Sequence, residues 1–599
     1  MTASGVANAP GMADPFAIRK YNAMLLLVAG LGGLLYGVDI GIIGGALPYL
    51  EATSGLTPAQ LSVIVAAVLL GSVISTLFAG ALSDWLGRKP VMMLSGLTFV
   101  LSIPVIALSQ GFGPLFFGRL LQGVSAGLIG VVVPLYLAEC LSATSRGKGT
   151  AIFQWLLTLG IVAAALVGIY FSYRVAAVEH AANAATLLHF KDTAWRSIFW
   201  VSLPPGVLFV LGSLLVTESP RWLFRRGMRD RAYVALLRSR NQVQAAIELD
   251  EMESLARAVV TEQLGSSRES LLQRKFVFPF LLACVILACN TATGVNSIIG
   301  YNAGILMQSG LNDLSAHWGY VLFTLVNFAM TAVGMALVDR KGRKFLFVLG
   351  TSGIIVSLVG VGISFLRTEK MSVDAGTQIQ SLVGPSQELK LQFDPAQAAK
   401  LLSVAGYTGN DIQAGRASLA IIYSYGDFTA ATAFVRSDDA ASAPIEISRS
   451  NCVPSNRIEA IFKDPFADLD AARIAPLKIQ KAPIGRVPES SHGWLVALGL
   501  YMFMAFYALG PGVCVWLALS ELMPTRIRSN GMSIALVINQ LVSTTLAGVF
   551  LPFVSKHGYS SMFFLFASFT VVYFAVTAFL LPETKGKTLE EIESHFAGS

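Results

Sequence analysis

The chain has 599 residues, of which 54% are hydrophobic and 13% are charged. Soluble proteins carry roughly 25% charged residues, so this composition argues against a soluble enzyme of this size. The 43 Lys and Arg residues outnumber the 36 Asp and Glu residues and give a formal net charge of +7. No basic cluster interleaved with aromatic residues indicates a nucleic-acid partner, so the positive balance favours a membrane protein with basic cytoplasmic loops.

Cysteine spacing and short motifs give no support to a metal centre or to catalysis. No two cysteines have CxxC or metal-ligand spacing, and no glycine-rich phosphate loop is present. We therefore expect no disulfide framework, no metal, no cofactor and no enzymatic activity. The five cysteines are Cys140, Cys284, Cys289, Cys452 and Cys514.

Twelve apolar segments follow a polar start at residues 1–21, which has no cleavable signal pattern and is expected to stay in the cytoplasm. Each segment is near the roughly 20 residues that cross a hydrocarbon core about 30 Å thick. The sequence therefore predicts an all-α membrane protein in the lipid bilayer. The segments are expected at 22–49, 58–82, 90–110, 113–138, 150–174, 196–216, 276–307, 317–338, 345–366, 493–520, 529–554 and 559–581.

Lys and Arg gather in alternate short loops, which fixes the expected orientation. Arg88 and Lys89 follow the second segment, and Arg343 and Lys344 follow the eighth, whereas the loops of the opposite side are nearly bare. Cytoplasmic loops carry the excess of Lys and Arg. Both termini, including the tail 582–599, are therefore expected in the cytoplasm of the cell, in a bacterial inner membrane.

The chain repeats itself, which predicts two six-helix halves at 22–216 and at 276–366 with 493–581. Asp84-Trp-Leu-Gly-Arg-Lys after the second segment recurs as Asp339-Arg-Lys-Gly-Arg-Lys after the eighth. Glu139, followed by Arg146, likewise recurs as Glu521 followed by Arg528.

Two long polar stretches interrupt this pattern. Residues 217–275 are expected to form a cytoplasmic helical linker. The interval from Asp84 to Glu139 is 55 residues, but that from Asp339 to Glu521 is 182, so an excess of 127 lies between the ninth and tenth segments. We expect this insert, 367–492, outside the cytoplasm as a small α/β appendage with a helix from Pro395 to Val404 and a strand-like run over 417–425, with disorder as the alternative.

These motifs together resemble the sugar-porter branch of the major facilitator superfamily, over the whole chain except the start and the insert. The resemblance implies twelve helices in two pseudo-symmetric halves, a monomer, and a central site alternately open to each side that carries a monosaccharide or polyol. The motifs are Asp84-x-x-Gly-Arg-Lys, Gly118-Arg119 with Gln122-Gly123, Glu139 with Arg146-Gly147, Glu218-Ser-Pro-Arg-Trp, Gly294-Val-Asn, Gly510-Pro-Gly with Trp516, and Pro582-Glu-Thr-Lys-Gly.

Asp39 is the one acidic residue well inside a predicted membrane segment, and Arg119 is expected at a similar depth. A charge at the bilayer centre costs about 2.5 kcal/mol or more, so it needs a reason. The functional interpretation is a proton site whose protonation is linked to conformation through Arg119, as in symporters of the resembled family. The alternative is a permanent structural ion pair.

A sugar site requires neutral hydrogen-bonding groups and an aromatic face. Gln154, Asn296, Asn327, Trp516 and Asn539 match the sugar-contacting positions of the resembled family. Asn290-Thr291 stands where members commonly have a Gln-Gln pair, and Gln540 where they often have Trp, so the particular sugar or polyol is left open. Any single amide can instead brace two helices.

The repeated charges form a candidate gate network at the cytoplasmic ends of the helices. Opposite charges there can bridge the two halves when the inner side is closed, whereas the alternative is a topogenic role alone, because a surface pair is often worth under about 1 kcal/mol. The set is Asp84, Arg88, Glu139, Arg146, Glu218, Asp339, Arg343, Glu521, Arg528 and Glu583.

The sequence therefore predicts import of a monosaccharide or polyol together with a proton. The alternatives are a facilitative sugar uniporter, against which Asp39 argues, and a non-transporting sugar sensor. The regular spacing of the remaining segments predicts that the transport core is complete without the insert. A cap over the outer vestibule that takes part in transport is the competing interpretation.

Overall fold

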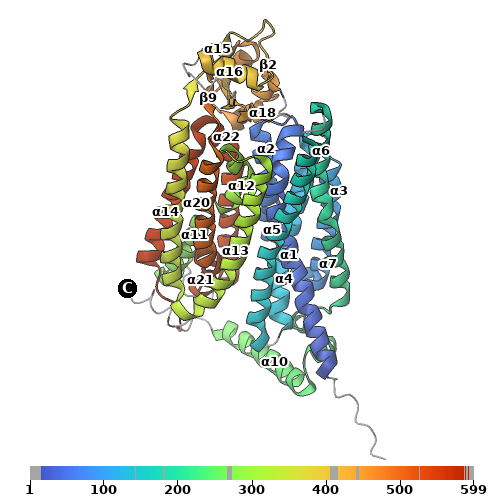
Figure 1. Cartoon of the computed structure of the whole chain (residues 1–599). Helices are drawn as coiled ribbons and strands as arrows, with labels where there is room; N and C mark the ends of the chain where they lie inside the picture. Colours follow the sequence, from blue (N-terminus) through green and yellow to red (C-terminus); the bar gives the residue numbers. More distant parts are fainter. Residues whose placement is uncertain are drawn as a thin grey trace, which may run out of the picture.

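The computed structural model describes residues 15–141, 143–179, 183–265, 273–404, 416–439, 444–524 and 527–585, with residues 587, 591 and 596. Most of the predicted N-terminal and C-terminal tails, part of the predicted linker and Arg526 therefore lie outside the described residues. The chain forms a helical bundle with a mixed α/β unit at one end and linker helices at the other (Figure 1). We call these the insert end and the linker end.

The N-terminal half consists of six spans. They are α1 (Pro15–Thr53), α2 (Pro58–Leu86), α3 (Arg88–Ala107), α4 (Phe112–Cys140), α5 (Ala143–Glu179), and the sixth span made of α6 (Ala184–Val201) and α7 (Leu203–Leu215). The sixth span was expected as one segment over 196–216, but it begins earlier and turns at Ser202, just before Pro204 and Pro205. Apolar composition indicates only the part of a helix that lies in the hydrocarbon core. It therefore does not predict the polar extensions of α5 and α6.

The described part of the linker contains α8 (Pro220–Arg225), α9 (Arg229–Ser239) and α10 (Gln242–Gly265), which pack on their own small apolar core. The linker docks on the N-terminal half, where Trp222 and Arg226 donate hydrogen bonds to the backbone carbonyl of Asp84 at the end of α2. The predicted helical pattern of the linker agrees with these helices.

The C-terminal half repeats the architecture with helices that are broken at glycines. They are α11 (Arg274–Ala292), α12 (Val295–Gln308), α13 (Asp313–Lys341), α14 (Arg343–Glu369), α20 (Ser490–Leu509), α21 (Pro511–Leu522), α22 (Arg528–Ala575) and a π-helical turn (Val576–Leu580).

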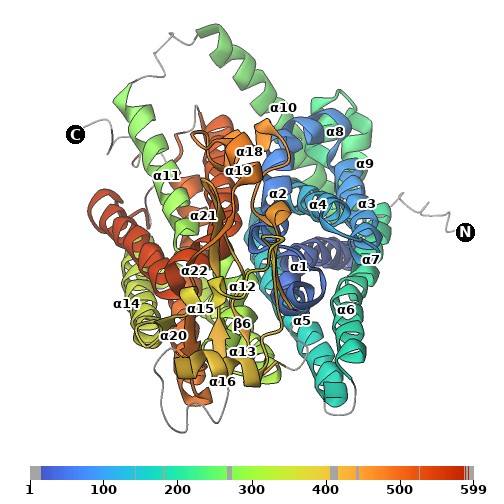
Figure 2. The ribbon, with the colours of Figure 1, turned by 90° about the horizontal axis from the view of Figure 1, so that it is seen from above.

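Eleven helical stretches in the described part are long and apolar enough to span a membrane. The last of them, Gly531–Leu580, holds two passes, because Gly558 interrupts the helix with a φ of 83°. The predicted twelve-span fold in two halves is thereby confirmed, and the two halves stand side by side when seen from the insert end (Figure 2).

The insert folds as a separate α/β unit with its own apolar core. In the described residues of the insert every strand pair is antiparallel, and the strand orders are β1-β9-β3-β6, β2-β7 and β5-β4-β8. The elements are β1 (Val373–Asp374), α15 (Gly376–Gln380), β2 (Leu389–Leu391), α16 (Pro395–Val404), β3 (Ala417–Leu419), β4 (Ile422–Tyr425), β5 (Phe428–Ala431), β6 (Val435–Arg436), β7 (Ile445–Ile447), η1 (Arg449–Asn451), α18 (Arg457–Lys463), α19 (Leu469–Ile474), β8 (Leu477–Lys481) and β9 (Pro483–Arg486).

The predicted helix from Pro395 to Val404 agrees with α16, and the predicted strand-like run over 417–425 is extended but interrupted. It is two strands, β3 and β4, that belong to different sheets. The chain breaks between them because the backbone N–H of Ala420 pairs with Pro483 and that of Ile421 pairs with the Thr432 hydroxyl.

The two ends of the bundle are packed differently. At the insert end one apolar core takes residues from both halves, including Tyr49 and Ile64 of the N-terminal half and Tyr320 and Phe550 of the C-terminal half. Toward the linker end the described membrane-spanning helices form separate cores instead, one in the N-terminal half and one in the C-terminal half. Burial of apolar surface therefore joins the halves at the insert end.

Candidate functional site

Asp39 lies near the middle of α1, and its side chain is 1% exposed. Neither carboxylate oxygen has a hydrogen-bond partner of good geometry among the described residues, although the side chain of Gln122 is near enough to interact with it. Arg119 of α4 and Gln122, one turn further on, lie beside this carboxyl group, with the Arg119 charge near enough for electrostatic attraction. A buried, unpaired carboxyl group is costly, so this site favours either a bound proton or a closer approach of Arg119.

Arg119 makes its contacts inside its own half. One of its Nη atoms donates to Oε1 of Gln122 over 2.6 Å, and its guanidinium lies 5.6 Å from the ring centre of Phe199. Its Nε has no hydrogen-bond partner in the part of the chain that the structure describes. The predicted partners thus lie close together, but a formed ion pair between Asp39 and Arg119 is absent from the described contacts.

The predicted substrate residues of the C-terminal half come together around α11, α12 and α22. Thr291 donates to the carbonyl of Asn539 over 3.1 Å, and Asn296 donates to the hydroxyl of Ser543 over 2.7 Å. Asn290 donates to the hydroxyl of Tyr507 on α20 over 3.2 Å. The polar groups of four helices, α11, α12, α20 and α22, therefore meet in one region in the middle of the half, close to the helix breaks at Gly294 and Gly510.

The other substrate candidates lie on different helices. Gln154 is on α5, Asn327 on α13 and Trp516 on α21. Gln154 and Asn327 each neighbour one member of a stacked pair, Trp155 with Phe328, whose ring centres are 4.9 Å apart. This stack joins the two halves next to both amides. No described contact links Trp516, which is 43% exposed, to the other candidates.

Sequence reasoning missed two hydroxyl groups in this region, those of Tyr507 and Tyr36. Tyr507 accepts from Asn290, and Tyr36 of α1 interacts with Gln540 of α22 across the two halves. The buried Oδ1 atoms of Asn290 and Asn539 have no hydrogen-bond partner among the described residues. Orphaned buried acceptors are uncommon in folded proteins, so a hydroxyl-bearing ligand can satisfy them.

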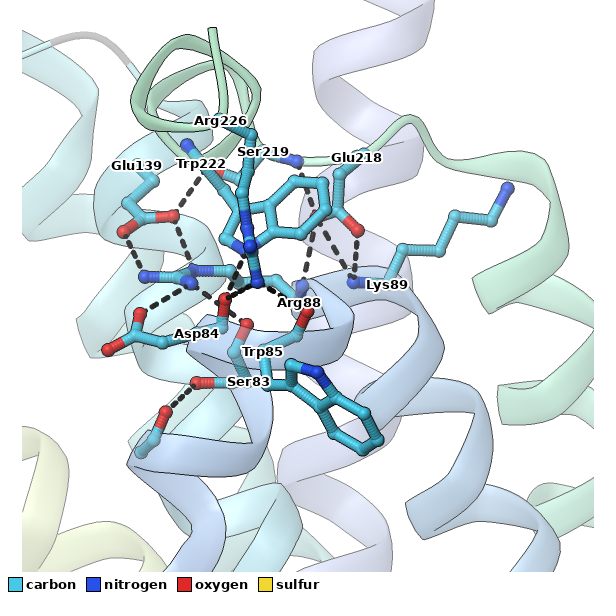
Figure 3. A network of polar contacts seen from close by, with 11 residues as sticks. Ser83, Asp84, Trp85, Arg88, Lys89, Glu139, Glu218, Ser219, Trp222 and Arg226 are labelled. Atoms are coloured by element: carbon cyan, nitrogen blue, oxygen red, sulfur yellow. Dashed lines mark hydrogen bonds and ion pairs between the residues drawn. The ribbon is translucent and has the colours of Figure 1, made fainter. Parts of the chain in front are cut away.

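The charges predicted as a gate form a compact cluster at the linker end of the N-terminal half (Figure 3). Arg88, which is 1% exposed, donates to both carboxylate oxygens of Glu139 over 2.8 and 2.9 Å and to Asp84 over 2.8 Å. Ser219 also hydrogen-bonds Glu139. Glu218 accepts from the backbone N–H groups of Arg88 and Lys89, at the N-terminus of α3. A carboxylate at a helix N-terminus pairs unsatisfied donors.

Two opposing effects act on the pKa of the Glu218 carboxyl group. Its burial raises the pKa of the carboxyl group above the ordinary value, and the backbone hydrogen bonds from Ser219, Lys89 and Arg88 offset only part of that rise. The preceding Gly87 adopts a φ of 105°, which favours glycine, and a Cβ there would meet the carboxylate of Glu218. Glycine at position 87 therefore suits both the backbone conformation before α3 and the close approach of the Glu218 carboxylate.

The C-terminal half contains a second copy of this cluster. Glu583 accepts from the backbone N–H groups of Arg343 and Lys344 over 3.0 and 3.2 Å, after Gly342 with a φ of 91°. Arg343 forms an ion pair of 3.1 Å with Glu521, which also accepts from Thr584 over 2.5 Å. Arg343 is more exposed than Arg88, with side-chain values of 14% and 1%.

The ion pairs that the structure describes among the predicted gate residues each stay within one half. The side chains of Arg146, Asp339 and Arg528 lie outside the described residues. Bridging of the two halves by this network therefore stays a prediction for a state closed at the linker end.

Polar contacts between the halves instead gather at the insert end, around a site that sequence reasoning missed. Oδ2 of Asp313 accepts from Tyr49 over 2.8 Å and from Ser172 over 2.7 Å, both in the other half. The two ring nitrogens of His317 face Oδ1 of Asp313, at 3.3 Å, and the carbonyl of Gly45, at 3.2 Å. The predicted eighth segment began at residue 317, but α13 begins at Asp313, which places both side chains on one helix turn.

Comparison with known proteins decides the family. The sequence model of the sugar (and other) transporter family matches residues 25–384 and 477–596, which leaves out most of the insert. The chain belongs to this family. Its members are transporters rather than enzymes, so the predicted family and the predicted absence of catalysis are both confirmed.

Curated relatives of this sugar transporter family member include transporters from animals and bacteria. The chain is 26% identical to the proton myo-inositol cotransporter of Homo sapiens over 581 residues, covering 96% of this chain and 81% of that protein. It is 29% identical to the arabinose-proton symporter of Bacillus subtilis over 345 residues, covering 57% of this chain and 71% of that protein.

Solved structures with this fold include the xylose transporter XylE from E. coli. Its partially occluded inward open conformation matches with a TM-score of 0.61 at 16% identity, covering 94% of this chain and 100% of that one. A second structure, of the same proton:xylose symporter bound to 6-bromo-6-deoxy-D-glucose, matches with a TM-score of 0.60 at 20% identity, covering 96% and 99%. The chain is therefore an integral membrane protein with the major facilitator fold.

Proposed function

We propose that this protein is a secondary active transporter that imports a monosaccharide or polyol together with a proton by alternating access. The observation that carries the proposal is Asp39, a buried acid beside Arg119 and Gln122 that forms no ion pair among the described residues. Protonation of the carboxyl group removes its charge, whereas an ionised Asp39 attracts Arg119. The two protonation states therefore favour different distances between α1 and α4.

The chemistry of the substrate region supports a neutral, hydroxyl-rich solute. The predicted binding residues are amides, a hydroxyl and an indole, with no Lys, Arg, Asp or Glu among them. Amides both donate and accept hydrogen bonds, as sugar hydroxyls do, and an indole face suits the apolar face of a sugar ring. The names of the relatives agree with either class of substrate, because they include a cotransporter of a polyol, myo-inositol, and a symporter of a monosaccharide, arabinose.

The difference between the two ends supports alternating access. The halves share a core and polar contacts at the insert end, whereas each half closes on its own core toward the linker end. Rocking of one half against the other would reverse this arrangement. The basic loops at the linker end favour a cytoplasmic linker end and an insert outside the cytoplasm.

The proposal is tested by uptake into proteoliposomes with a panel of labelled monosaccharides and polyols. We expect at least one solute to accumulate above its external concentration when an inward proton gradient is imposed, and only to equilibrate without it. Equilibration alone under both conditions would make the protein a facilitative uniporter. Binding of a sugar without any flux would make it a sensor.

A further inference from the structure

A short stretch of the insert, residues 434–439, lies over the seam between the two halves. We call it the bridging segment. The insert is joined to the C-terminal half at both of its ends, through α14 and α20. The bridging segment nevertheless contacts helices of both halves, so the insert is attached to the N-terminal half as well as to the C-terminal half.

On the C-terminal half the bridging segment is held by backbone carbonyl groups. Arg436 donates to the carbonyls of Met307 and Leu311 over 2.6 and 2.8 Å, at the end of α12. The last carbonyl groups of a helix lack partners within the helix, and a cation there is favourable. Gln308 donates to the carbonyl of Phe434 over 3.2 Å, and the Phe434 ring lies 6.1 Å from that of Tyr559.

Asp438 orients the end of the bridging segment. It accepts from Nε and Nη2 of Arg436, both over 2.9 Å, and from Arg416 over 3.0 Å. Burial by itself would raise the pKa of Asp438, but the hydrogen bonds and charges of the two arginines outweigh it and lower the pKa below its ordinary value. Asp438 therefore stays ionised at neutral pH and fixes the backbone next to Asp439.

On the N-terminal half the contact is an ion pair. The ammonium group of Lys191, in α6, donates to both carboxylate oxygens of Asp439 over 3.0 and 3.2 Å. The Lys191 side chain is 11% exposed and that of Asp439 is 31% exposed, so solvent screens this pair less than a pair on an open surface. Two residues of the insert only three positions apart, Arg436 and Asp439, thus dock on α12 and on α6.

The space beneath the bridging segment is hollow. A cavity of about 710 Å³ lies between the insert and the ends of the helices. Its lining includes Glu51 and His189 of the N-terminal half, Gln308 of the C-terminal half, and Arg416 and Thr432 of the insert. The insert therefore covers the helix ends at this end of the bundle and leaves a cavity between itself and them.

We propose that the bridging segment is a latch that stabilises the state closed at the insert end, with Lys191 and Asp439 as the contact that opens. The proposal deepens the proposed function and rests on it. Because Arg436 holds the insert on the C-terminal half, the two halves can separate at this end only if the contact between Asp439 and α6 breaks. The latch adds its stabilisation to that of the shared core and of the Asp313 cluster.

The latch is tested by the distance between the halves at the insert end. Spin labels replace Ala185, exposed in α6, and Ser491, exposed in the first turn of α20, and their separation is measured in substrate-free protein in lipid nanodiscs. In Lys191→Ala and in Asp439→Ala we expect the population with the longer distance to rise about two- to fivefold. The charge-exchanged double variant, Lys191→Asp with Asp439→Lys, should return the distribution toward that of the parent.

Lys390→Ala is the matched control, because it breaks an ion pair of 2.6 Å with Glu446 inside the insert. An unchanged distance in both single variants, or an equal change in the control, would overturn the latch. The measurement needs no transport, so it separates the latch from the proposed function. Failure of the proposed function would appear as absence of uptake by the unmodified protein, whatever the label distances.

Discussion

The two ends of the bundle use charged and polar residues in opposite ways. At the insert end Asp313 and His317 contact Tyr49, Ser172 and Gly45 of the other half, within an apolar core that both halves share. At the linker end the described ion pairs, such as Arg88 with Glu139, tie together helices of a single half. In the proposed alternating-access cycle, contacts between halves set the equilibrium between states, whereas contacts within a half set the stability of that half, so the two ends should respond differently to mutation.

The comparison is tested most strongly at the linker end with Arg88→Ala. Removal of the guanidinium leaves the buried Glu139 without its bidentate partner, and breaking such a pair costs about 3–5 kcal/mol. We expect a large fall in the Tm of the purified protein. Arg343→Ala, in the more exposed copy of the cluster, should lower the Tm less. Equal losses would contradict the difference in burial between the two copies.

At the insert end, Asp313→Asn should shift the equilibrium toward the open state. It weakens charge-assisted hydrogen bonds from the other half and the pairing with His317, at a cost of about 1–3 kcal/mol. Labels at Ala185 and Ser491 should report a larger population at the longer distance. The control is Asp230→Asn, in the linker helix α9. No change in the label distance would mean that the cluster braces α13 and does not hold the halves together.

Between the two ends, Gln154→Ala and Trp516→Ala should each weaken substrate binding by about 1 kcal/mol or more. Gln154 offers hydrogen bonds to a desolvated hydroxyl group, and Trp516 offers a stacking face. Calorimetry in detergent with the transported solute measures the change. Trp85→Phe, an exposed indole at the linker end, should bind as the parent does. Unchanged affinity in both variants would move the substrate site elsewhere.

The smallest effect is expected when the insert is removed. Replacing residues 370–489 by about ten Gly and Ser residues should leave a folded membrane protein, because the insert has its own core and α14 packs against α20. Transport should be retained with an altered apparent affinity, as the loss of a latch implies. A monodisperse variant that does not transport at saturating substrate would instead make the insert an obligatory part of the mechanism.

The architecture could be predicted because hydropathy and internal repeats record it directly. The repeat of Asp84 and Arg88 as Asp339 and Arg343 predicted two equivalent halves, and the structure gives the copies equivalent backbone contacts with Glu218 and Glu583. The excess between Asp339 and Glu521 likewise located the insert. These features depend on order along the chain, which the sequence contains.

The contacts between halves could not be predicted, because they depend on which faces of two helices meet. Asp313 lies just before the predicted eighth segment and His317 is its first residue, so hydropathy gave no sign that Asp313 reaches Tyr49 and Ser172 of the other half. Lys191 lies outside the predicted sixth segment, 196–216, but the structure places it inside α6. Its partner Asp439 is 248 residues away in the chain, and no local pattern marks such a pair.

The central claim, that a proton bound at Asp39 drives accumulation, is tested most directly with Asp39→Asn in proteoliposomes. The amide keeps the size of the side chain but removes the titratable group between the two ends. We predict that the variant exchanges labelled solute across the membrane at a measurable rate, yet does not concentrate it when an inward proton gradient is imposed. Accumulation by Asp39→Asn to the level of the parent protein would contradict the account.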